Sequence, residues 1–271
     1  MAQSFRRADG ARPLISGHRG HCTAAPENTL AALRATVEAG GTAAEIDAVL
    51  SADGEIVILH DLLVDRTTDG TGAAADMTLS ALKRLDAGSW FGPGFAGERI
   101  PTLAETLDFA HAHDFMIEVE IKEKRNLPTM AAALARALAD PHDRSRVMLL
   151  SFDHAWLGWL KDRLPDVATA GIVPVRHPDP LAVAQSARLD QLSIDLDVFD
   201  PDQARILREV GLSLRCHAYN PPRIAAMDRA GLDPRAQLAA YLREGLIDTL
   251  SGDDVEWVRH LVDDALGSAA G

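Results

Sequence analysis

Two acidic residues and a histidine in one short segment have the types and spacing needed for metal binding or proton transfer. Glu45 and Asp47 lie two positions apart in the segment AEIDAVL, and alternation along a strand places both side chains on one face. Asp53-Gly54 is then typical of a two-residue hairpin turn, a register that predicts His60 directly opposite Asp47. We therefore expect the two carboxylates and the imidazole to converge on one face of the hairpin.

Glu120 is the third candidate metal ligand. In the segment IEVEIK, Glu118, Glu120 and Lys122 alternate along one strand face. Carboxylate oxygens suit Mg²⁺ or Ca²⁺, and three carboxylates buried without a cation would force at least one of them to bind a proton. A single acidic residue at a strand end often caps a helix or pairs with arginine instead. The set of three, Glu45, Asp47 and Glu120, predicts a divalent-metal site.

His18 and His60 are the candidate acid–base catalysts. Because an imidazole titrates near neutral pH, one histidine of such a pair can remove a proton while the other donates one. A lone histidine is more often structural, so the interpretation depends on the pair. The sequence leaves open which histidine is the acid and which the base. His21, in the loop after the first expected strand, is a further candidate for a substrate contact.

The overall charge limits the partners of the chain. With 40 acidic residues against 27 lysines and arginines, the formal net charge is −13, which repels nucleic acid and anionic membrane surfaces. A nucleic-acid partner is therefore not expected. A site for an anionic small molecule must supply its own positive charge, and Arg19 and Lys122 are the candidates for phosphate contacts. The alternative for Arg19 is an ion pair with Glu27, and Arg66 could reach the site or order its own loop.

Length and composition are those of a globular protein with one large domain. The 271 residues are 47% hydrophobic and 25% charged, and Cys22 and Cys216 are the only cysteines, which excludes a disulfide framework. No run of about 18 apolar residues could span a membrane. The N-terminal segment MAQSFRRADGARP lacks the apolar core of a secretory signal, so the expected location is the cytoplasm. The oligomeric state is not predicted.

Short β-rich runs alternate with amphipathic helical patterns along nearly the whole chain, which predicts a parallel sheet with right-handed crossovers. The eight expected strands are Leu14–Gly17, Ala43–Val49, Phe115–Ile121, Arg146–Ser151, Val167–Ile172, Gln191–Leu196, Leu212–His217 and Asp248–Ser251. Helical patterns between them include Asn28–Ala39, Thr102–His113, Thr129–Ala139, Asp202–Val210 and Arg235–Arg243. The predicted fold class is α/β, a single (β/α)₈ TIM barrel with a short β-hairpin excursion after the second strand.

One domain is expected over residues 1–271, with its core at about 14–262 and flexible ends. The segment Asp61–Arg99 is the longest between strands and is expected to form a lid or rim over one end of the barrel. Catalytic groups of such barrels lie at the C-terminal ends of the strands. His18, Asp47 and His217 all fall at such ends, which is where the fold would place a site.

Seven motifs occur in order along the first half of the chain: HRG (18–20), PENTLAAL (26–33), EID (45–47), DGEIVILHD (53–61), DRTTDGTG (65–72), IPTLAETL (100–107) and EIK (120–122). Together they resemble the glycerophosphodiester phosphodiesterase family, closely from about residue 14 to 124 and more weakly beyond. The resemblance implies a phospholipase-C-like phosphodiesterase barrel. It also implies a phosphoric diester hydrolase of lipid and glycerol metabolism that splits a glycerophosphodiester into glycerol 3-phosphate and an alcohol.

The resemblance further implies a role for each candidate residue. The family's site residues match catalytic His18 and His60, metal-binding Glu45, Asp47 and Glu120, and phosphate-binding Arg19 and Lys122. The implied mechanism passes through a cyclic phosphate, formed when one histidine deprotonates the glycerol hydroxyl of the substrate and the other protonates the leaving alcohol. Water then opens the ring with the two roles exchanged, while the metal orients the hydroxyl and offsets phosphate charge.

Three segments depart from the family's pattern. Where family members have a Trp-containing, WTVN-like segment, this chain has HAYN (217–220), and His217 becomes a candidate substrate contact. The connection 220–245 is long, and the final strand end reads SGD (251–253). The leaving alcohol of the substrate therefore stays open.

Two alternative functions remain on the sequence alone. A lyase of the phospholipase-like type would release the cyclic phosphate without opening it, although no apolar or basic patch for docking on a membrane is predicted. A non-catalytic phosphodiester-binding barrel would keep the fold, but all the catalytic and metal-binding residues of the family are present.

Overall fold

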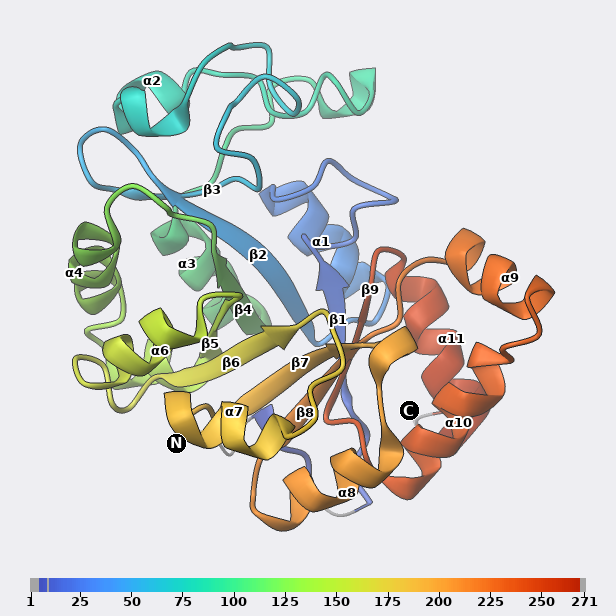
Figure 1. Cartoon of the computed structure of the whole chain (residues 1–271). Coiled ribbons are helices and arrows are strands. Elements are labelled where there is room, and N and C mark those ends of the chain that lie inside the picture. The colour runs from blue at the N-terminus through green and yellow to red at the C-terminus, as the bar shows by residue number, and fades with distance from the viewer. Residues whose placement is uncertain (1–4, 9, 269–271) are drawn as a thin grey trace.

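Eight parallel strands close into a barrel (Figure 1). The computed structural model describes residues 5–8 and 10–268. The barrel strands are β1 (Leu14–His18), β2 (Ala43–Leu50), β4 (Met116–Ile121), β5 (Val147–Ser151), β6 (Ala168–Val173), β7 (Gln191–Asp195), β8 (Ser213–His217) and β9 (Thr249–Gly252). They neighbour one another in the order β1-β9-β8-β7-β6-β5-β4-β2, and a further pairing of β1 with β2 closes the ring. The predicted barrel is confirmed, and each predicted strand forms within one residue of its expected ends.

Helices cover the outside of the barrel. They are α1 (Leu30–Glu38), α2 (Leu79–Leu82), α3 (Leu103–His113), α4 (Leu127–Ala137), α5 (Pro141–Arg146), α6 (His154–Lys161), α7 (Pro180–Ala187), α8 (Pro201–Glu209), α9 (Pro221–Arg229), α10 (Pro234–Glu244) and α11 (Val255–Leu266), with short 3₁₀ turns η2 (Ala74–Asp76), η3 (Pro93–Phe95) and η4 (Leu196–Val198). Thr29 caps α1, and Thr102 with Glu105 forms a reciprocal capping box that starts α3. None of these described helices is both long and apolar enough to cross a membrane.

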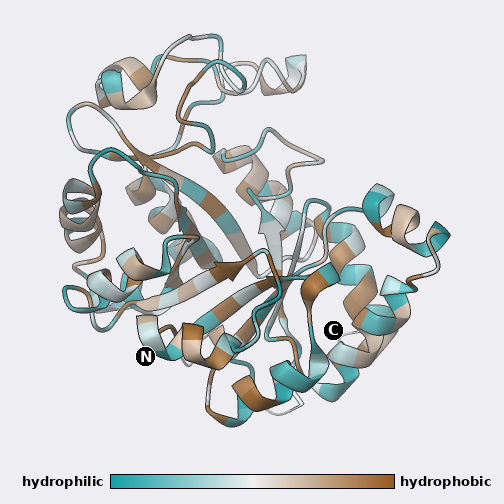
Figure 2. Ribbon diagram, in the orientation of Figure 1, coloured by the Kyte–Doolittle hydropathy of each residue, from teal (hydrophilic) through white to brown (hydrophobic). Residues whose placement is uncertain are grey.

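The two faces of strand β2 carry different kinds of buried side chain. Along β2, Ile46 and Ala48 belong to the hydrophobic core between strands and helices. Because side chains alternate along a strand, Glu45 and Asp47 point to the other face, the barrel interior. Figure 2 shows this alternation as brown and teal bands along β2. The strand is thus buried over its whole length while it carries charged groups on its inner face.

The barrel interior changes from apolar to charged along the strands. Toward their N-terminal ends, Phe5 and Met148 belong to an apolar cluster. Above this cluster Glu118 and Arg215 form an ion pair, with 3.0 Å between Oε2 and Nε, and both residues are buried. The next level, at the C-terminal strand ends, contains the candidate site.

The predicted hairpin after β2 forms, but its register differs by one residue from the expected one. β3 (Ile56–Ile58) pairs antiparallel with β2. The connecting loop has three residues rather than two, because Gly54 adopts a left-handed conformation with φ of +79° at its end. Leu59 therefore lies opposite Asp47, and its N–H donates to the Asp47 carbonyl at 2.8 Å. The predicted register of His60 with Asp47 is wrong.

The segment Asp61–Arg99, cyan to green at the top of Figure 1, packs beside the hairpin rather than against the main core. Leu82 of this segment and Ile100 just after it share a second hydrophobic cluster with Val49 and Val57 of the hairpin. The segment therefore has an anchor of its own on the hairpin, on the face of β2 that also carries Asp47. Its expected role as a lid or rim stays a prediction.

We predict that Gly54→Ala destabilises the protein by about 1 kcal/mol, because an alanine is strained in the left-handed region. The added Cβ would meet Thr129 Cγ2 at an ordinary 3.5 Å, so backbone strain is the expected cause. The measurement is the free energy of unfolding in urea. Gly94→Ala is the matched control, since Gly94 has open space and no positive φ, and it should leave stability unchanged or slightly raised. Equal effects of the two substitutions would contradict the three-residue loop.

Candidate active site

Three buried carboxylates meet at the C-terminal ends of β2 and β4. Asp47 and Glu120 are register partners on these neighbouring strands, and Glu45 precedes Asp47 by two residues on the same strand face. One oxygen from each carboxylate lies within 4.8 Å of the other two. The three residues are only 1–7% exposed. The structure therefore brings together the three residues predicted as metal ligands.

Two buried oxygens of this cluster accept no hydrogen bond from the described residues, although one of them, Asp47 Oδ1, has an ion-pair contact with Lys122 at 3.3 Å. Glu45 Oε2 accepts the backbone N–H of Arg19 at 3.0 Å, and Asp47 Oδ2 accepts from the Asn28 amide at 2.7 Å. Within the described part of the chain, Glu45 Oε1 and Asp47 Oδ1 have no hydrogen-bond partner. Burial, reinforced by the charges of Asp47 and Glu120, raises the pKa of Glu45 well above its usual range. A divalent cation with oxygen ligands fits this donor set, because it would satisfy both oxygens and offset the repulsion.

Asn28 holds Asp47 in place, a role that the sequence did not reveal. Its amide oxygen accepts the backbone N–H of Asp47 at 3.0 Å, while its amide nitrogen bonds the carboxylate. Asn28 and Arg19 both have left-handed backbones, with φ of 58° and 60°, a conformation that asparagine tolerates better than most residues. The available signal was the asparagine of PEN (26–28), one position before the helix cap Thr29.

Two cationic side chains lie beside the carboxylates. Lys122 Nζ contacts Glu120 Oε1 and lies 3.3 Å from Asp47 Oδ1. Arg19 Nε lies 3.6 Å from Asp47 Oδ2, and Arg19 also donates to Glu27 at 2.9 Å. The ion pair with Glu27, expected as the alternative for Arg19, is therefore present together with a contact to the site. The lysine and arginine side chains are 18% and 20% exposed, so a solute at the barrel mouth could reach both.

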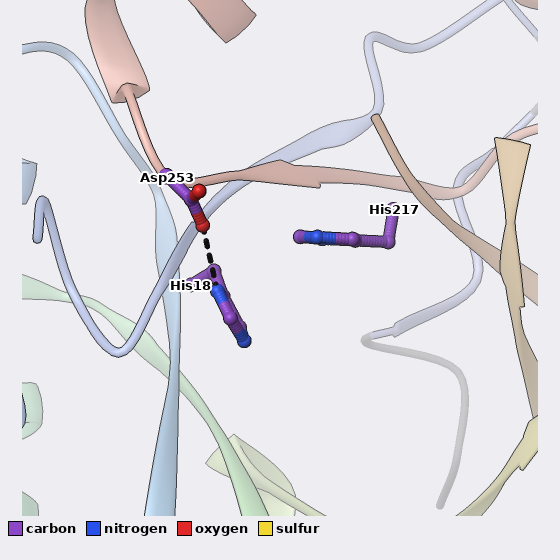
Figure 3. Close-up of side chains that lie close together, drawn as sticks. All are labelled: His18, His217 and Asp253. Carbon is purple, nitrogen blue, oxygen red and sulfur yellow. Dashed lines mark hydrogen bonds and ion pairs between the residues drawn. The ribbon is translucent and has the colours of Figure 1, made fainter. Parts of the chain in front are cut away.

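A hydrogen-bonded histidine–aspartate pair lies at the ends of β1 and β9 (Figure 3). His18 ends β1 as the register partner of Glu45, and Asp253 follows β9. His18 Nδ1 lies 2.7 Å from Asp253 Oδ1, and the Asn220 amide donates to Asp253 Oδ2 at 3.0 Å. Burial alone would raise the pKa of Asp253, but the hydrogen bonds outweigh it and lower the pKa to about 2. Asp253 is therefore a charged acceptor for His18, a partnership that the sequence did not indicate.

His217, predicted as a substrate contact, ends β8 and faces His18. The two ring centroids are 4.8 Å apart with planes tilted by 59°, and Tyr219 packs edge-on against His217 at 5.3 Å. Burial, together with the charges of His18 and Arg215, lowers the pKa of His217 well below its usual range. His217 is therefore a neutral imidazole at the barrel mouth.

His60 is linked to the site by a different route from the predicted hairpin pairing. Its Nδ1 lies 2.6 Å from Asp61 Oδ1. Arg66 bridges Asp61 and Glu27, and Glu27 in turn pairs with Arg19. The hydrogen bond from Arg66, followed by that of His60, lowers the pKa of Asp61 to about 2 against the opposing effect of burial. A chain of ion pairs thus connects the predicted catalytic His60 with Arg19 beside the carboxylates.

Comparison with known proteins identifies a consistent set of relatives. A model of the glycerophosphoryl diester phosphodiesterase family matches residues 18–256. The chain is 41% identical over 155 residues to a glycerophosphodiester phosphodiesterase of Caldanaerobacter subterraneus subsp. tengcongensis, a match that covers 57% of this chain and 64% of that relative. It is 28% identical over 229 residues to a glycerophosphodiester phosphodiesterase of Bacillus subtilis, with 77% of each covered. The first of these alignments spans less than two thirds of the relative's own length.

A similar structure is that of a phosphodiesterase from Oleispira antarctica in complex with the product sn-glycerol-3-phosphate. It matches with a TM-score of 0.78 and 27% sequence identity, over 97% of this chain and 99% of that one. The fold is thus shared with this phosphodiesterase over nearly the whole of both chains.

We predict that Glu45→Gln stabilises the metal-free protein and weakens its response to Mg²⁺ or Ca²⁺, because it removes both a like charge and a ligand. The stability contributed by protonated Glu45 is complete below its ordinary pKa of 4.5 and is lost as pH rises through the raised pKa. At neutral pH in chelator the variant should therefore melt above the wild type. A cation at about 100 times its Kd should stabilise the wild type by about 2.7 kcal/mol, or about 5–10 °C in Tm, as measured by calorimetry.

Glu118→Gln is the matched control. Glu118 lies on the neighbouring strand as the register partner of Glu45, but its charge is paired with Arg215 at 3.0 Å. Its loss leaves a buried guanidinium unpaired and should cost about 3–5 kcal/mol with or without metal. A Glu45→Gln protein that melts below the wild type in chelator would contradict the repulsion among the three carboxylates.

Proposed function

The chain belongs to the glycerophosphoryl diester phosphodiesterase family, and from this premise we propose that it is a metal-dependent enzyme that hydrolyses a glycerophosphodiester to glycerol 3-phosphate and an alcohol. The observation that carries the proposal is the set Glu45, Asp47 and Glu120, with two buried oxygens that accept no hydrogen bond from the described residues, together with the His18–Asp253 pair. The related phosphodiesterase that holds sn-glycerol-3-phosphate as its product supports this choice of substrate.

The three carboxylates would hold the metal ion, Mg²⁺ or Ca²⁺. Bound there, the ion would offset phosphate charge and orient the attacking hydroxyl. Lys122 and Arg19 now compensate carboxylates that they approach at 3.3 Å and 3.6 Å. When a cation takes over that compensation, their N–H groups become available to phosphate oxygens at the barrel mouth. His217, whose ring faces that of His18, is proposed as a further contact for the substrate.

Proton transfer is assigned to His18 and His60. One of them removes the proton from the free glycerol hydroxyl, whose oxygen attacks phosphorus and closes a cyclic phosphate, while the other protonates the departing alcohol oxygen. The two then exchange roles as water opens the ring to glycerol 3-phosphate. For His18, ionised Asp253 accepts a hydrogen bond from Nδ1 and so leaves Nε2 as the atom that exchanges the proton. Asp253 acts through His18 and is a positioning residue.

We expect His18→Ala and His60→Ala each to lower kcat by at least about 10²-fold, the scale on which positioned acid–base catalysis contributes. Turnover of a panel of glycerophosphodiesters with choline, ethanolamine, inositol, glycerol and sugar headgroups is the measurement. Removal of divalent ions by a chelator should cause a loss of the same order, reversed by Mg²⁺ or Ca²⁺. The control is His142→Ala, an exposed histidine of α5, which should retain full activity. Retention of activity in either of the first two variants would refute the two-histidine mechanism.

The products separate a hydrolase from a lyase. We expect glycerol 3-phosphate to accumulate, with cyclic phosphate seen only transiently during a single turnover. Phosphorus NMR of the reaction distinguishes the two compounds directly. A cyclic phosphate that accumulates in stoichiometric amount and is never opened would favour a lyase, and a protein that binds the panel without turnover would favour a binding barrel.

The wider setting of the protein stays a prediction. A role in lipid and glycerol metabolism is proposed from the family resemblance, and a cytoplasmic location and a single domain over residues 1–271 are proposed from the sequence.

A further inference from the structure

His18, His217 and Asp253 form a second group of potential metal ligands, separate from the three carboxylates. One nitrogen of each imidazole and one carboxylate oxygen lie within 4.8 Å of one another. The three side chains come from the ends of β1, β8 and β9, which are neighbours in the closed barrel. Figure 3 shows the His217 imidazole directed toward the contact between His18 and Asp253.

Neighbouring residues hold this group in a fixed arrangement. The Asn220 amide donates to Asp253 Oδ2 at 3.0 Å, which leaves Oδ1 directed at His18. His217 Nδ1 lies 3.5 Å from Ser251 Oγ, so its other nitrogen lies on the edge away from that serine. Ser251 Oγ itself accepts from Arg215 at 2.7 Å. Such outer contacts are the kind that orient histidine and carboxylate ligands in metal sites.

The two ligand groups differ in the ions that they favour. Glu45, Asp47 and Glu120 offer oxygen alone, which suits Mg²⁺ or Ca²⁺. Two imidazoles and one carboxylate are instead a frequent ligand set of Zn²⁺, with a position left for water or a substrate.

We propose that His18, His217 and Asp253 form a second metal site that binds a borderline ion such as Zn²⁺, and that its occupation inhibits the enzyme. The ion would take the place of the proton that His18 Nδ1 and Asp253 Oδ1 now share at 2.7 Å, and that proton is released to solvent. His18 would then be a metal ligand and could no longer transfer protons. The binding stands on the geometry alone, whereas the inhibition also rests on the proposed function of His18.

Binding is tested with Co²⁺, which reports its ligands by visible absorption, in the presence of saturating Mg²⁺ to fill the carboxylate site. We expect one Co²⁺ per chain with the intense visible bands of a nitrogen-ligated, low-coordinate ion. His217→Phe should weaken Co²⁺ binding by more than about 10-fold, since loss of even an outer-shell partner costs 10–100-fold. Thermal melting of the metal-free variant verifies that it is folded, and His217→Gln provides a second, polar replacement.

A surface group supplies the matched control. His111 Nε2 lies 2.6 Å from Asp143 Oδ1, and His142 Nδ1 lies 3.3 Å from His111 Nε2. His142→Phe removes one of these imidazoles, and we expect it to leave the Co²⁺ spectrum unchanged. The proposal is overturned if no Co²⁺ binds beside Mg²⁺, if both His217 variants bind it as tightly as the wild type, or if His142→Phe abolishes the signal.

The inhibitory half is tested by Zn²⁺ titration of Mg²⁺-supported turnover, each protein being compared with its own zinc-free rate. The wild type should be inhibited at the Zn²⁺ concentrations that displace Co²⁺, and the His217 variants should need at least about 10-fold more, matching their weaker binding. If Zn²⁺ instead raised the turnover of the wild type but not that of the His217 variants, the proposed inhibition would be overturned, whereas the proposed binding site would stand. A protein that binds Co²⁺ as expected but never turns over a phosphodiester would instead refute the proposed function.

Discussion

Burial of like charge at one end of the barrel is the constraint on which the rest of the site depends. Glu45, Asp47 and Glu120 are nearly closed off from water, and each ionised carboxylate raises the free energy of the others. Neighbouring residues reduce this repulsion without abolishing it: Asn28 takes a left-handed backbone to bond Asp47, and Lys122 adds a positive charge. Two oxygens still have no hydrogen-bond partner in the described chain. The cluster therefore offers oxygens to which a cation could bind.

One level deeper, a buried carboxylate is paired with an arginine, although its Oε1 also has no hydrogen-bond partner among the described residues. Glu118 lies two residues before Glu120 on the same strand, yet it is paired with Arg215 at 3.0 Å and accepts from Ser16 at 2.7 Å. Arg215 extends its remaining donors to serines of neighbouring strands, so this level is bound together internally. The compensating charge of Glu120 is instead Lys122, which is partly open to solvent. The deeper level thus contains a structural ion pair, Glu118 with Arg215, whereas the level at the barrel mouth contains groups that can exchange partners, Glu120 with Lys122.

Much of this arrangement is local and could be predicted from the sequence. Alternation in the strand segments was sufficient to place Glu45 and Asp47 on one face, and the strand–helix rhythm was sufficient to predict the barrel. The register of the hairpin was predicted wrongly, because Asp-Gly fits both two- and three-residue loops and the conformation of Gly54 decides between them. The contact of His18 with Asp253 joins residues 235 positions apart, and only closure of the ring creates it. Local patterns carry no information on such a pair.

Closure of the barrel through β1 and β9 also has a consequence for the order in which the site is assembled during synthesis. β1 is the first barrel strand to leave the ribosome and β9 is the last, and they pair directly from Leu14–Thr249 to Gly17–Gly252. The imidazole of His18 is thus synthesised long before the carboxylate that orients it. A nascent chain, or one whose last strand has detached, has the three carboxylates and His18 but lacks the carboxylate of Asp253. The contact between His18 and Asp253 therefore forms only when the last strand of the barrel has paired with the first.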